Sequence, residues 1–201
     1  LVSDAGTPLV SDPGFMLVRA AIESGIEAVP VPGPCAAIAA LSVAGLPTDR
    51  FCFEGFLPAR AAARRGRLES LAREARTLVF YESPQRLAAS LADMAAAFGG
   101  ARRAAVAREL TKAHETVYHG DLGDLARRVT EDANMSRGEL AVVVEGAADP
   151  PPTATEEIDR VLGVLLSSMP ASQAAGLAAE LTGAPRNDCY RRAVALAAGG
   201  A

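Results

Sequence analysis

Short runs of β-branched and aromatic residues alternate with alanine- and leucine-rich stretches as far as residue 147, and this alternation limits the fold most. Apolar runs such as Leu140–Val144 are typical of buried strands, whereas the longer alanine-rich stretches are typical of helices. Strands are expected at residues 51–53, 77–81, 104–110, 115–119 and 140–144. Helices are expected at residues 35–44, 60–74, 84–98 and 122–131. Strands that alternate with helices predict an α/β fold, and we expect parallel strand pairing.

A proline-rich strip separates this region from the end of the chain. Three consecutive prolines at residues 150–152 predict a stiff extended linker, which we place at residues 148–155. Only helical patterns follow, at residues 155–168, 171–181 and 186–198. The last two meet at a turn that contains Gly183, so we expect a small helix-turn-helix-like domain at residues 156–201. A packing or dimerisation cap is the alternative interpretation.

The formal net charge of −4 argues against passive, non-specific binding to nucleic acid, because proteins that bind in this way are usually basic. The charge is unevenly distributed, however, since residues 60–76 hold six arginines and only two glutamates. One interpretation is a solvated helix face, and the other is a patch that contacts RNA phosphates. The candidates for phosphate contact are Arg60, Arg64, Arg65 and Arg67.

The three cysteines, Cys35, Cys52 and Cys189, are far apart and form no CxxC pair. This usage is typical of reduced, packing cysteines, so we expect a cytoplasmic protein. No apolar run approaches the ~18 residues that a membrane-spanning helix needs, so no membrane association is expected. His114 and His119 would lie on opposite faces of a strand, and no further cysteine or histidine completes a ligand set, so no metal site is expected.

The chain begins with Leu1 and Val2, which have the character of a strand, so we infer that an N-terminal part of the first domain is missing. A segment made mostly of small residues then follows from Ser3 to Gly14. In open α/β sheets, ligands bind beyond the carboxyl ends of the strands, and small residues there let backbone amides approach a ligand. Residues 3–14 are therefore a candidate ligand-binding loop. The alternative is an ordinary strand-to-helix turn with a side-chain helix cap.

Two prolines flank a glycine in a second candidate turn, at residues 31–36. Each proline fixes its own backbone and keeps the preceding residue out of the helical region. The segment therefore predicts a rigid wall, which suits shape recognition more than acid–base chemistry.

The segments SDAGTPLVSDPG (residues 3–14) and VPGPCA (residues 31–36) strongly resemble the tetrapyrrole-methylase superfamily. Three further motifs are similar to one branch of it, the methyltransferases that act on a ribose 2′-hydroxyl of small-subunit ribosomal RNA. These motifs are EGFLP at residues 54–58, FYESP at residues 80–84 and ARELTK at residues 107–112. The match runs in the right order along nearly the whole chain. Cys35 and Gln85 depart from the family, which usually has serine and histidine at these positions.

The resemblance implies two α/β domains that hold the methyl donor, S-adenosylmethionine, in the cleft between them and that assemble as a homodimer. Residues 1–50 would be the C-terminal part of the first domain, and residues 51–147 the second domain. One wall of the donor site would be formed by Asp4, Ala5, Gly6 and Thr7. The opposing wall would be formed by Pro32, Gly33 and Pro34, and the second domain would contribute Tyr81 and Glu82. An ordinary core position is the alternative for Tyr81.

The resemblance also implies a substrate, the ribose 2′-hydroxyl of a cytidine in the 16S ribosomal RNA of the small ribosomal subunit. A ribose hydroxyl is a poor nucleophile, which must be held against the donor methyl group and helped to lose its proton. If residues 106–111 are extended, Glu109 and Thr111 share one face. The polar candidates for assistance are Glu109, Lys112, His114 and Glu115, of which Glu109 and Lys112 are preferred because they lie inside the family motif. The alternatives are a tetrapyrrole methyltransferase of the same superfamily and an inactive RNA-binding fragment.

Overall fold

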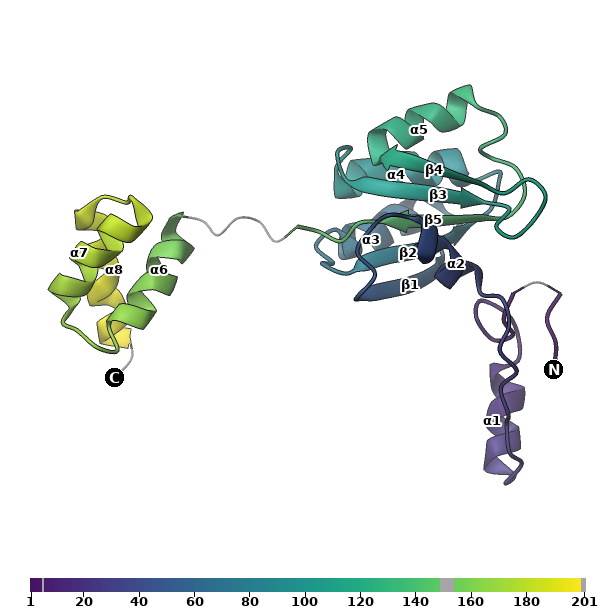
Figure 1. The fold of residues 1–201 in the computed structure, drawn as a ribbon, viewed down its shortest axis with the longest axis horizontal. Coiled ribbons are helices and arrows are strands. Elements are labelled where there is room, and N and C mark those ends of the chain that lie inside the picture. Colours follow the sequence, from purple (N-terminus) through teal and green to yellow (C-terminus); the bar gives the residue numbers. More distant parts are fainter. Residues whose placement is uncertain (5, 149–153, 200–201) are drawn as a thin grey trace. The chain divides into compact units, whose positions relative to one another are not determined.

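The computed structural model describes residues 1–4, 6–148 and 154–199. The chain divides into two compact units, Leu1–Ala147 and Ala148–Ala201 (Figure 1). Residues 149–153 of the expected linker lie outside the described residues. The finer division into residues 1–50, 51–147, 148–155 and 156–201 stays a prediction.

The first unit is built on a five-stranded sheet with the strand order β1-β2-β5-β3-β4. The strands are β1 (Phe51–Phe56), β2 (Thr77–Glu82), β3 (Arg103–Arg108), β4 (Thr116–Asp121) and β5 (Leu140–Val144). The helices are α1 (Phe15–Glu23), α2 (Ala36–Val43), α3 (Ala61–Leu71), α4 (Leu87–Phe98) and α5 (Leu122–Glu131). This mixture of sheet and helices confirms the α/β fold class.

The expectation of parallel pairing is wrong for most of the sheet. β1 and β2 are parallel, whereas β5 is antiparallel to both β2 and β3, and β3 is antiparallel to β4. The turn between β3 and β4 is too short for the crossover that a parallel pair needs, so these strands form a hairpin. β2 and β3 run in the same direction on either side of β5. The carboxyl ends of β1, β2 and β3 therefore lie at one edge of the sheet, next to the start of β5.

Alternate side chains of the central strands enter two separate hydrophobic clusters, because successive residues of a strand point to opposite faces. Leu78 and Phe80 of β2 belong to the cluster that α3, α4 and α5 cover. Val79 belongs to the other cluster, which α2 covers with Ala40 and Leu41 (Figure 1). Helices therefore pack on both faces of the sheet, and this packing positions the carboxyl ends of β1, β2 and β3.

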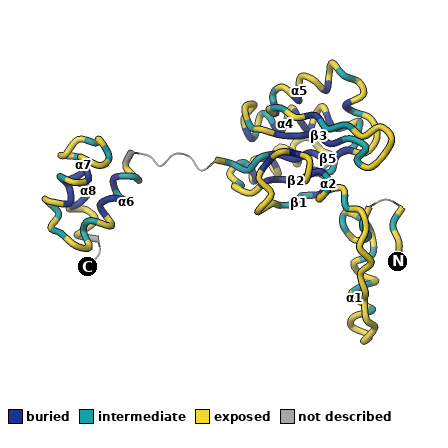
Figure 2. Tube along the Cα trace, viewed as in Figure 1, coloured by how far each residue is buried: buried dark blue, intermediate teal, exposed yellow. Residues whose placement is uncertain are grey.

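Residues 1–35 contribute little to this core. α1 contains no buried residue, and Phe15, Met16, Leu17 and Ile22 are exposed (Figure 2). Residues 1–4, whose first two positions were expected to belong to a strand, lie outside any strand. The reason is that none of the described strands pairs with them, and an extended segment needs such a partner for its backbone groups.

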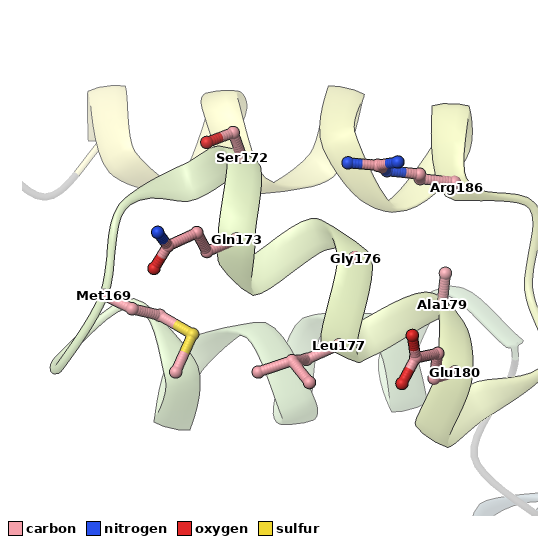
Figure 3. A pocket seen from close by; sticks show the side chains of 8 residues that line it. All are labelled: Met169, Ser172, Gln173, Gly176, Leu177, Ala179, Glu180 and Arg186. Carbon is pink, nitrogen blue, oxygen red and sulfur yellow. The ribbon is translucent and has the colours of Figure 1, made fainter.

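The second unit contains α6 (Ala154–Leu165), α7 (Ala171–Thr182) and α8 (Arg186–Gly199), as expected from the sequence. The three helices enclose a small core that includes Leu162, Ala174 and Cys189. α7 ends at Gly183, whose left-handed backbone (φ 72°) suits glycine. An open groove runs beside α7 and is bordered by Arg186 at the start of α8 (Figure 3). Among the described helices of both units, none has both the length and the apolarity of a membrane span.

Candidate active site

A cavity of about 270 Å³ lies at the sheet edge where β1, β2 and β3 end. The loop at residues 6–12, the start of α2, the ends of β1 and β2, the turn after β3 and the start of β5 all contribute to its lining. The lining residues are Gly6, Thr7, Val10, Ser11, Asp12, Ala36, Phe56, Tyr81, Glu82, Leu110, Glu139, Leu140 and Ala141. This is the edge at which α/β sheets bind ligands, so the cavity is the candidate active site.

The loop at residues 6–12 is strained. Leu9 and Ser11 have φ angles of 72° and 58°, in the left-handed region that residues with a Cβ rarely adopt. Strain of this kind costs about 1–3 kcal/mol per residue and clusters at ligand sites. The Thr7 hydroxyl donates a 2.8 Å hydrogen bond to the Pro34 carbonyl, which joins the two turns that the sequence singled out.

Some of the expected donor-site residues line the cavity and others do not. Those in the lining are Gly6, Thr7, Tyr81 and Glu82. Asp4 borders a separate hollow, which it shares with Asp12 and Gly14. Asp12 borders both concave surfaces, whereas Asp4 is not part of the cavity lining.

The proline wall lies outside the cavity lining. Pro32 and Gly33 are exposed. Pro34 is connected to the cavity loop through its carbonyl, which accepts the hydrogen bond of the Thr7 hydroxyl. Ala5 lies outside the described residues. A role in donor binding for all of these residues stays a prediction.

Tyr81 forms an aromatic wall of the cavity. Its ring meets those of Phe53 and Phe56 edge to face, with centroid separations of 4.9 and 5.7 Å. Its hydroxyl accepts a 3.0 Å hydrogen bond from the backbone amide of Ala37 in α2. Burial raises the pKa of Tyr81, so the hydroxyl is neutral at physiological pH. Tyr81 therefore packs against the hydrophobic cluster that α2 covers, and it is also part of the cavity lining.

Glu82, the last residue of β2, lines the cavity, and its side chain is fully buried. Its carboxylate accepts a 2.5 Å hydrogen bond from the Ser90 hydroxyl and a 2.8 Å bond from the Ser83 amide. The Arg86 Nε lies 3.3 Å from Oε1, and Arg86 Nη2 lies 3.4 Å from Oε2. A buried carboxylate needs such partners. Its charge is therefore compensated within the fold.

The turn after β3 carries the candidate catalytic residues. β3 ends at Arg108, and both Glu109 and Thr111 have left-handed backbones, with φ angles of 51° and 66°. The expectation that Glu109 and Thr111 share one face of a strand is therefore wrong, because the hairpin is already turning towards β4. Lys112 Nζ lies 2.9 Å from Glu109 Oε1 and 2.7 Å from Glu139 Oε2.

Glu109, Lys112 and Glu139 thus form a charged cluster at the rim of the cavity. Hydrogen bonds from Lys112 and from the Glu139 amide lower the pKa of Glu109. Hydrogen bonds to Glu139 and then to Glu109 raise the pKa of Lys112. Both Glu109 and Lys112 are therefore charged at neutral pH. Of the three residues, Glu139 is the one that lines the cavity.

The arginine-rich segment forms α3, with Arg60 as the residue before its first turn. Arg64 is buried, with a side-chain exposure of 7%, and pairs with Asp93 of α4 at 2.7 Å. Arg67 is half exposed and pairs with Glu54 at 2.6 Å. Arg60 and Arg65 are exposed. The structure therefore removes Arg64 from the phosphate-contacting candidates, because its guanidinium is used to join α3 to α4.

Sequence reasoning missed several cavity residues. Phe56 and Leu110 lie inside the EGFLP and ARELTK motifs, so a signal for them was present. Glu139 lies in a loop before an apolar strand and has no motif around it. Within the described part of the chain, no group of three or more His, Cys, Asp or Glu side chains is arranged to hold a metal ion.

Comparison with protein families identifies the class that this fold and site define. Residues 1–126 match the family of tetrapyrrole (corrin/porphyrin) methylases. Because this match covers more than half of the chain, the protein belongs to the tetrapyrrole methylase family. Residues 152–197 match the RsmI C-terminal HTH domain, which confirms the helix-turn-helix-like character expected for the end of the chain.

Curated relatives narrow the class further. The chain is 57% identical over 190 residues to a protein of Xylella fastidiosa named ribosomal RNA small subunit methyltransferase I, over 94% of this chain and 70% of the relative. Proteins of the same name from Pseudomonas aeruginosa and Escherichia coli O157:H7 are 56% identical over 196 residues and 50% identical over 194 residues. Each alignment covers 96% of this chain, and 70% and 68% of the respective relative.

Solved structures share the fold at low sequence identity. The methyltransferase CobJ gives a TM-score of 0.53 at 23% identity, and the alignment covers 73% of this chain and 64% of the CobJ chain. A cobalt precorrin-4 methyltransferase gives a TM-score of 0.50 at 17% identity, and the alignment covers 68% of this chain and 59% of the chain of that methyltransferase. The present chain thus spans less than two thirds of these two structures. At such identities the similarity concerns the fold alone.

Proposed function

We propose that this protein transfers a methyl group from S-adenosylmethionine to the ribose 2′-hydroxyl of a cytidine in 16S ribosomal RNA. One observation carries the proposal, namely that four motifs far apart in the sequence meet at one cavity. The loop at residues 6–12, Phe56 of EGFLP, Tyr81 of FYESP and Leu110 of ARELTK all line it. The names of the relatives at 50–57% identity favour ribosomal RNA over a tetrapyrrole as the substrate.

The cavity residues fit such a donor chemically. S-adenosylmethionine carries an aromatic base, hydroxyl and amino groups and a positively charged sulfur. Tyr81 and Phe56 provide aromatic surface for the base and the cation. Thr7, Ser11 and Asp12 provide oxygen atoms for the polar groups. A volume of about 270 Å³ lies just below the ~300–1,000 Å³ typical of small-molecule sites, so these residues enclose part of the donor.

The protein's own residues have three tasks in this reaction. They hold the nucleotide so that its hydroxyl oxygen lies in line with the methyl group that the donor supplies. Apolar side chains such as Leu110 and Leu140 exclude water from the reacting atoms. Glu109 and Lys112 form an ion pair beside the cavity lining and act on the reacting hydroxyl through their contacts with Glu139, which is part of the lining.

When the protein is incubated with small ribosomal subunits and S-adenosylmethionine that carries a labelled methyl group, the label is expected in the RNA. After alkaline digestion the label should stay in a dinucleotide, because a methylated 2′-oxygen cannot attack the neighbouring phosphate. Large ribosomal subunits are the matched control and should take up no label. Label in a mononucleotide would indicate base methylation and contradict the proposal, as would labelling of an added tetrapyrrole without labelling of RNA.

Arg60, which precedes α3, and the exposed arginines Arg65 and Arg67 of α3 are proposed to hold the RNA by its phosphates. Reversing the charge of Arg60, Arg65 and Arg67 together should weaken RNA binding and make it less dependent on salt. Each lost phosphate contact lowers the slope of log K against log salt by roughly 0.7–0.9, so the triple variant should lose about 2–3 units of slope. The measurement is a filter-binding titration at several salt concentrations.

Arg19 and Arg127 provide the control for this experiment, because each is exposed and ion-paired on another helix. Reversing the charge of both should leave the salt slope almost unchanged. Donor binding should survive in both variants. Equal slopes for the triple variant and the unsubstituted protein would return α3 to the role of a solvated helix.

We also propose a homodimer in the cytoplasm. The apolar side chains exposed on α1, such as Phe15 and Leu17, support a larger assembly, since surfaces of this kind are usually covered by protein. The three cysteines are free, which suits a reducing compartment.

A further inference from the structure

Glu139 is the member of the charged cluster that faces the cavity. It precedes β5 at the edge where β2 and β3 end, because its neighbour Leu140 pairs with the last residues of both strands. Glu139 lines the cavity and its side chain is 65% exposed, whereas Glu109 and Lys112 are outside the lining. Among the described residues, Lys112 is the one side-chain partner of its carboxylate, at 2.7 Å. Glu139 is therefore the member of the cluster that combines a place in the cavity lining with a largely exposed side chain.

Glu109, by contrast, is already engaged. Its Oε1 accepts a 2.9 Å hydrogen bond from Lys112 Nζ and a 2.8 Å bond from the Glu139 amide. Its side chain is only 16% exposed. The same hydrogen bonds lower its pKa and make it a weaker base. Lys112 stays protonated at neutral pH, and an ammonium group has no lone pair with which to accept a proton.

The backbone fixes Glu139 against the turn after β3. The Glu109 amide donates a 2.9 Å hydrogen bond to the Glu139 carbonyl, and the Glu109 carboxylate receives the Glu139 amide in return. Gly138, with φ of 73°, packs so closely on the Glu109 side chain that a Cβ at this position would collide with it. Glu109 and Lys112 therefore hold Glu139 from two sides, one through the backbone and one through the side chain.

We propose that Glu139 is the catalytic carboxylate that accepts the proton of the ribose 2′-hydroxyl, with Glu109 and Lys112 as its positioning residues. The inference rests on the methyl transfer proposed above. The hydroxyl oxygen forms a bond to the methyl carbon, and the carbon–sulfur bond breaks with its electron pair going to sulfur. The O–H bond breaks as the oxygen becomes positively charged, and the proton passes to the Glu139 carboxylate. The products are the 2′-O-methylated ribose, the neutral thioether and the protonated carboxyl group.

The test is single-turnover and steady-state methyl transfer by the full chain carrying Glu139→Gln. The amide keeps the size of the side chain, but neither its oxygen nor its nitrogen is basic enough to accept the proton. We expect kcat to fall about 100-fold or more, in the range of general base catalysis. The KM for ribosomal subunits and the calorimetric affinity for S-adenosylmethionine should change less than about twofold, as expected for a group that acts in the transition state. Glu131→Gln, on the exposed end of α5, is the matched control and should keep the full rate.

Chemical rescue separates catalysis from a structural role. In Glu139→Ala, added formate should restore the rate at least about tenfold, because a small carboxylate can enter the vacated position and accept the proton. Formate should not accelerate the unsubstituted protein. Glu109→Gln should lower kcat less than Glu139→Gln and should not respond to formate, because the Glu139 carboxylate is still present but less well held.

Three outcomes overturn the inference, and they differ from a failure of the proposed function. Glu139→Gln that transfers at the unsubstituted rate excludes Glu139 as the base. If Glu139→Gln changes only KM or donor affinity and leaves kcat unchanged, Glu139 has a binding role. If formate does not raise the rate of Glu139→Ala, Glu139 has a structural role. Absence of transfer to RNA by the unsubstituted chain, by contrast, contradicts the proposed function itself and removes this inference with it.

Discussion

Gly6→Val is expected to weaken the binding of S-adenosylmethionine at least tenfold, which corresponds to about 1.4 kcal/mol. Gly6 lines the cavity and has a left-handed backbone with φ of 71°. A β-branched side chain is strained in that conformation, and it would also occupy space where the backbone approaches the ligand. Isothermal titration calorimetry of the donor against each variant measures the effect directly.

Gly25 offers a closely matched control for this substitution. Its φ is 74°, and, as at Gly6, an added Cβ would meet no atom within 4 Å. Gly25 follows α1 and is not part of the cavity lining. Gly25→Val therefore introduces the same backbone strain without the obstruction and should leave donor affinity unchanged. If the two variants bind the donor equally well, the loop at residues 6–12 is not part of the donor site.

The positions of strands and helices could be predicted from the sequence because they depend on local periodicity. The apolar run Leu140–Val144 is a strand in the expected place. Its neighbours could not be predicted in the same way, because strand pairing depends on residues far away in the chain. β5 lies between β2 and β3 and is antiparallel to both, and the β3–β4 hairpin is the third antiparallel pairing of the four. The short separation between the predicted strands at residues 104–110 and 115–119 was nevertheless a signal for a hairpin.

The candidate site shows the same division between local and distant information. Gly6 and Tyr81 could be found because they lie in recognisable motifs and line the cavity. Glu139 could not be found, because only the antiparallel placement of β5 brings it to the carboxyl ends of the other strands. Arg64 was assigned to the surface by its charge alone. Its spacing from Leu68 places both residues on the buried face of α3, and that helical period was visible in the sequence.

Glu82→Ala is expected to lower the free energy of unfolding of the first unit by about 3 kcal/mol. The Glu82 side chain is fully buried, whereas that of Arg86 is 27% exposed, so the expected loss lies at the lower end of the range for a broken buried ion pair. The Arg86 Nε is already buried without a hydrogen bond, and the substitution also removes its ionic partner. Ser90 loses the acceptor of a 2.5 Å hydrogen bond in the same step. Urea-induced unfolding followed by circular dichroism measures the change, and amide hydrogen exchange in β2 and β5 assigns it to the first unit.

Two further substitutions distinguish this explanation from a general sensitivity to lost carboxylates. Glu23→Ala removes an exposed i,i+4 partner of Arg19 and should cost no more than about 0.5 kcal/mol. Ser90→Ala removes one hydrogen bond but leaves the Glu82–Arg86 pair, and should cost about 1 kcal/mol. The expected order of destabilisation is therefore Glu82→Ala, then Ser90→Ala, then Glu23→Ala. A loss for Glu82→Ala no larger than that for Glu23→Ala would show that the buried Glu82–Arg86–Ser90 contacts do not stabilise the first unit, and that Arg86 finds water once its partner is gone.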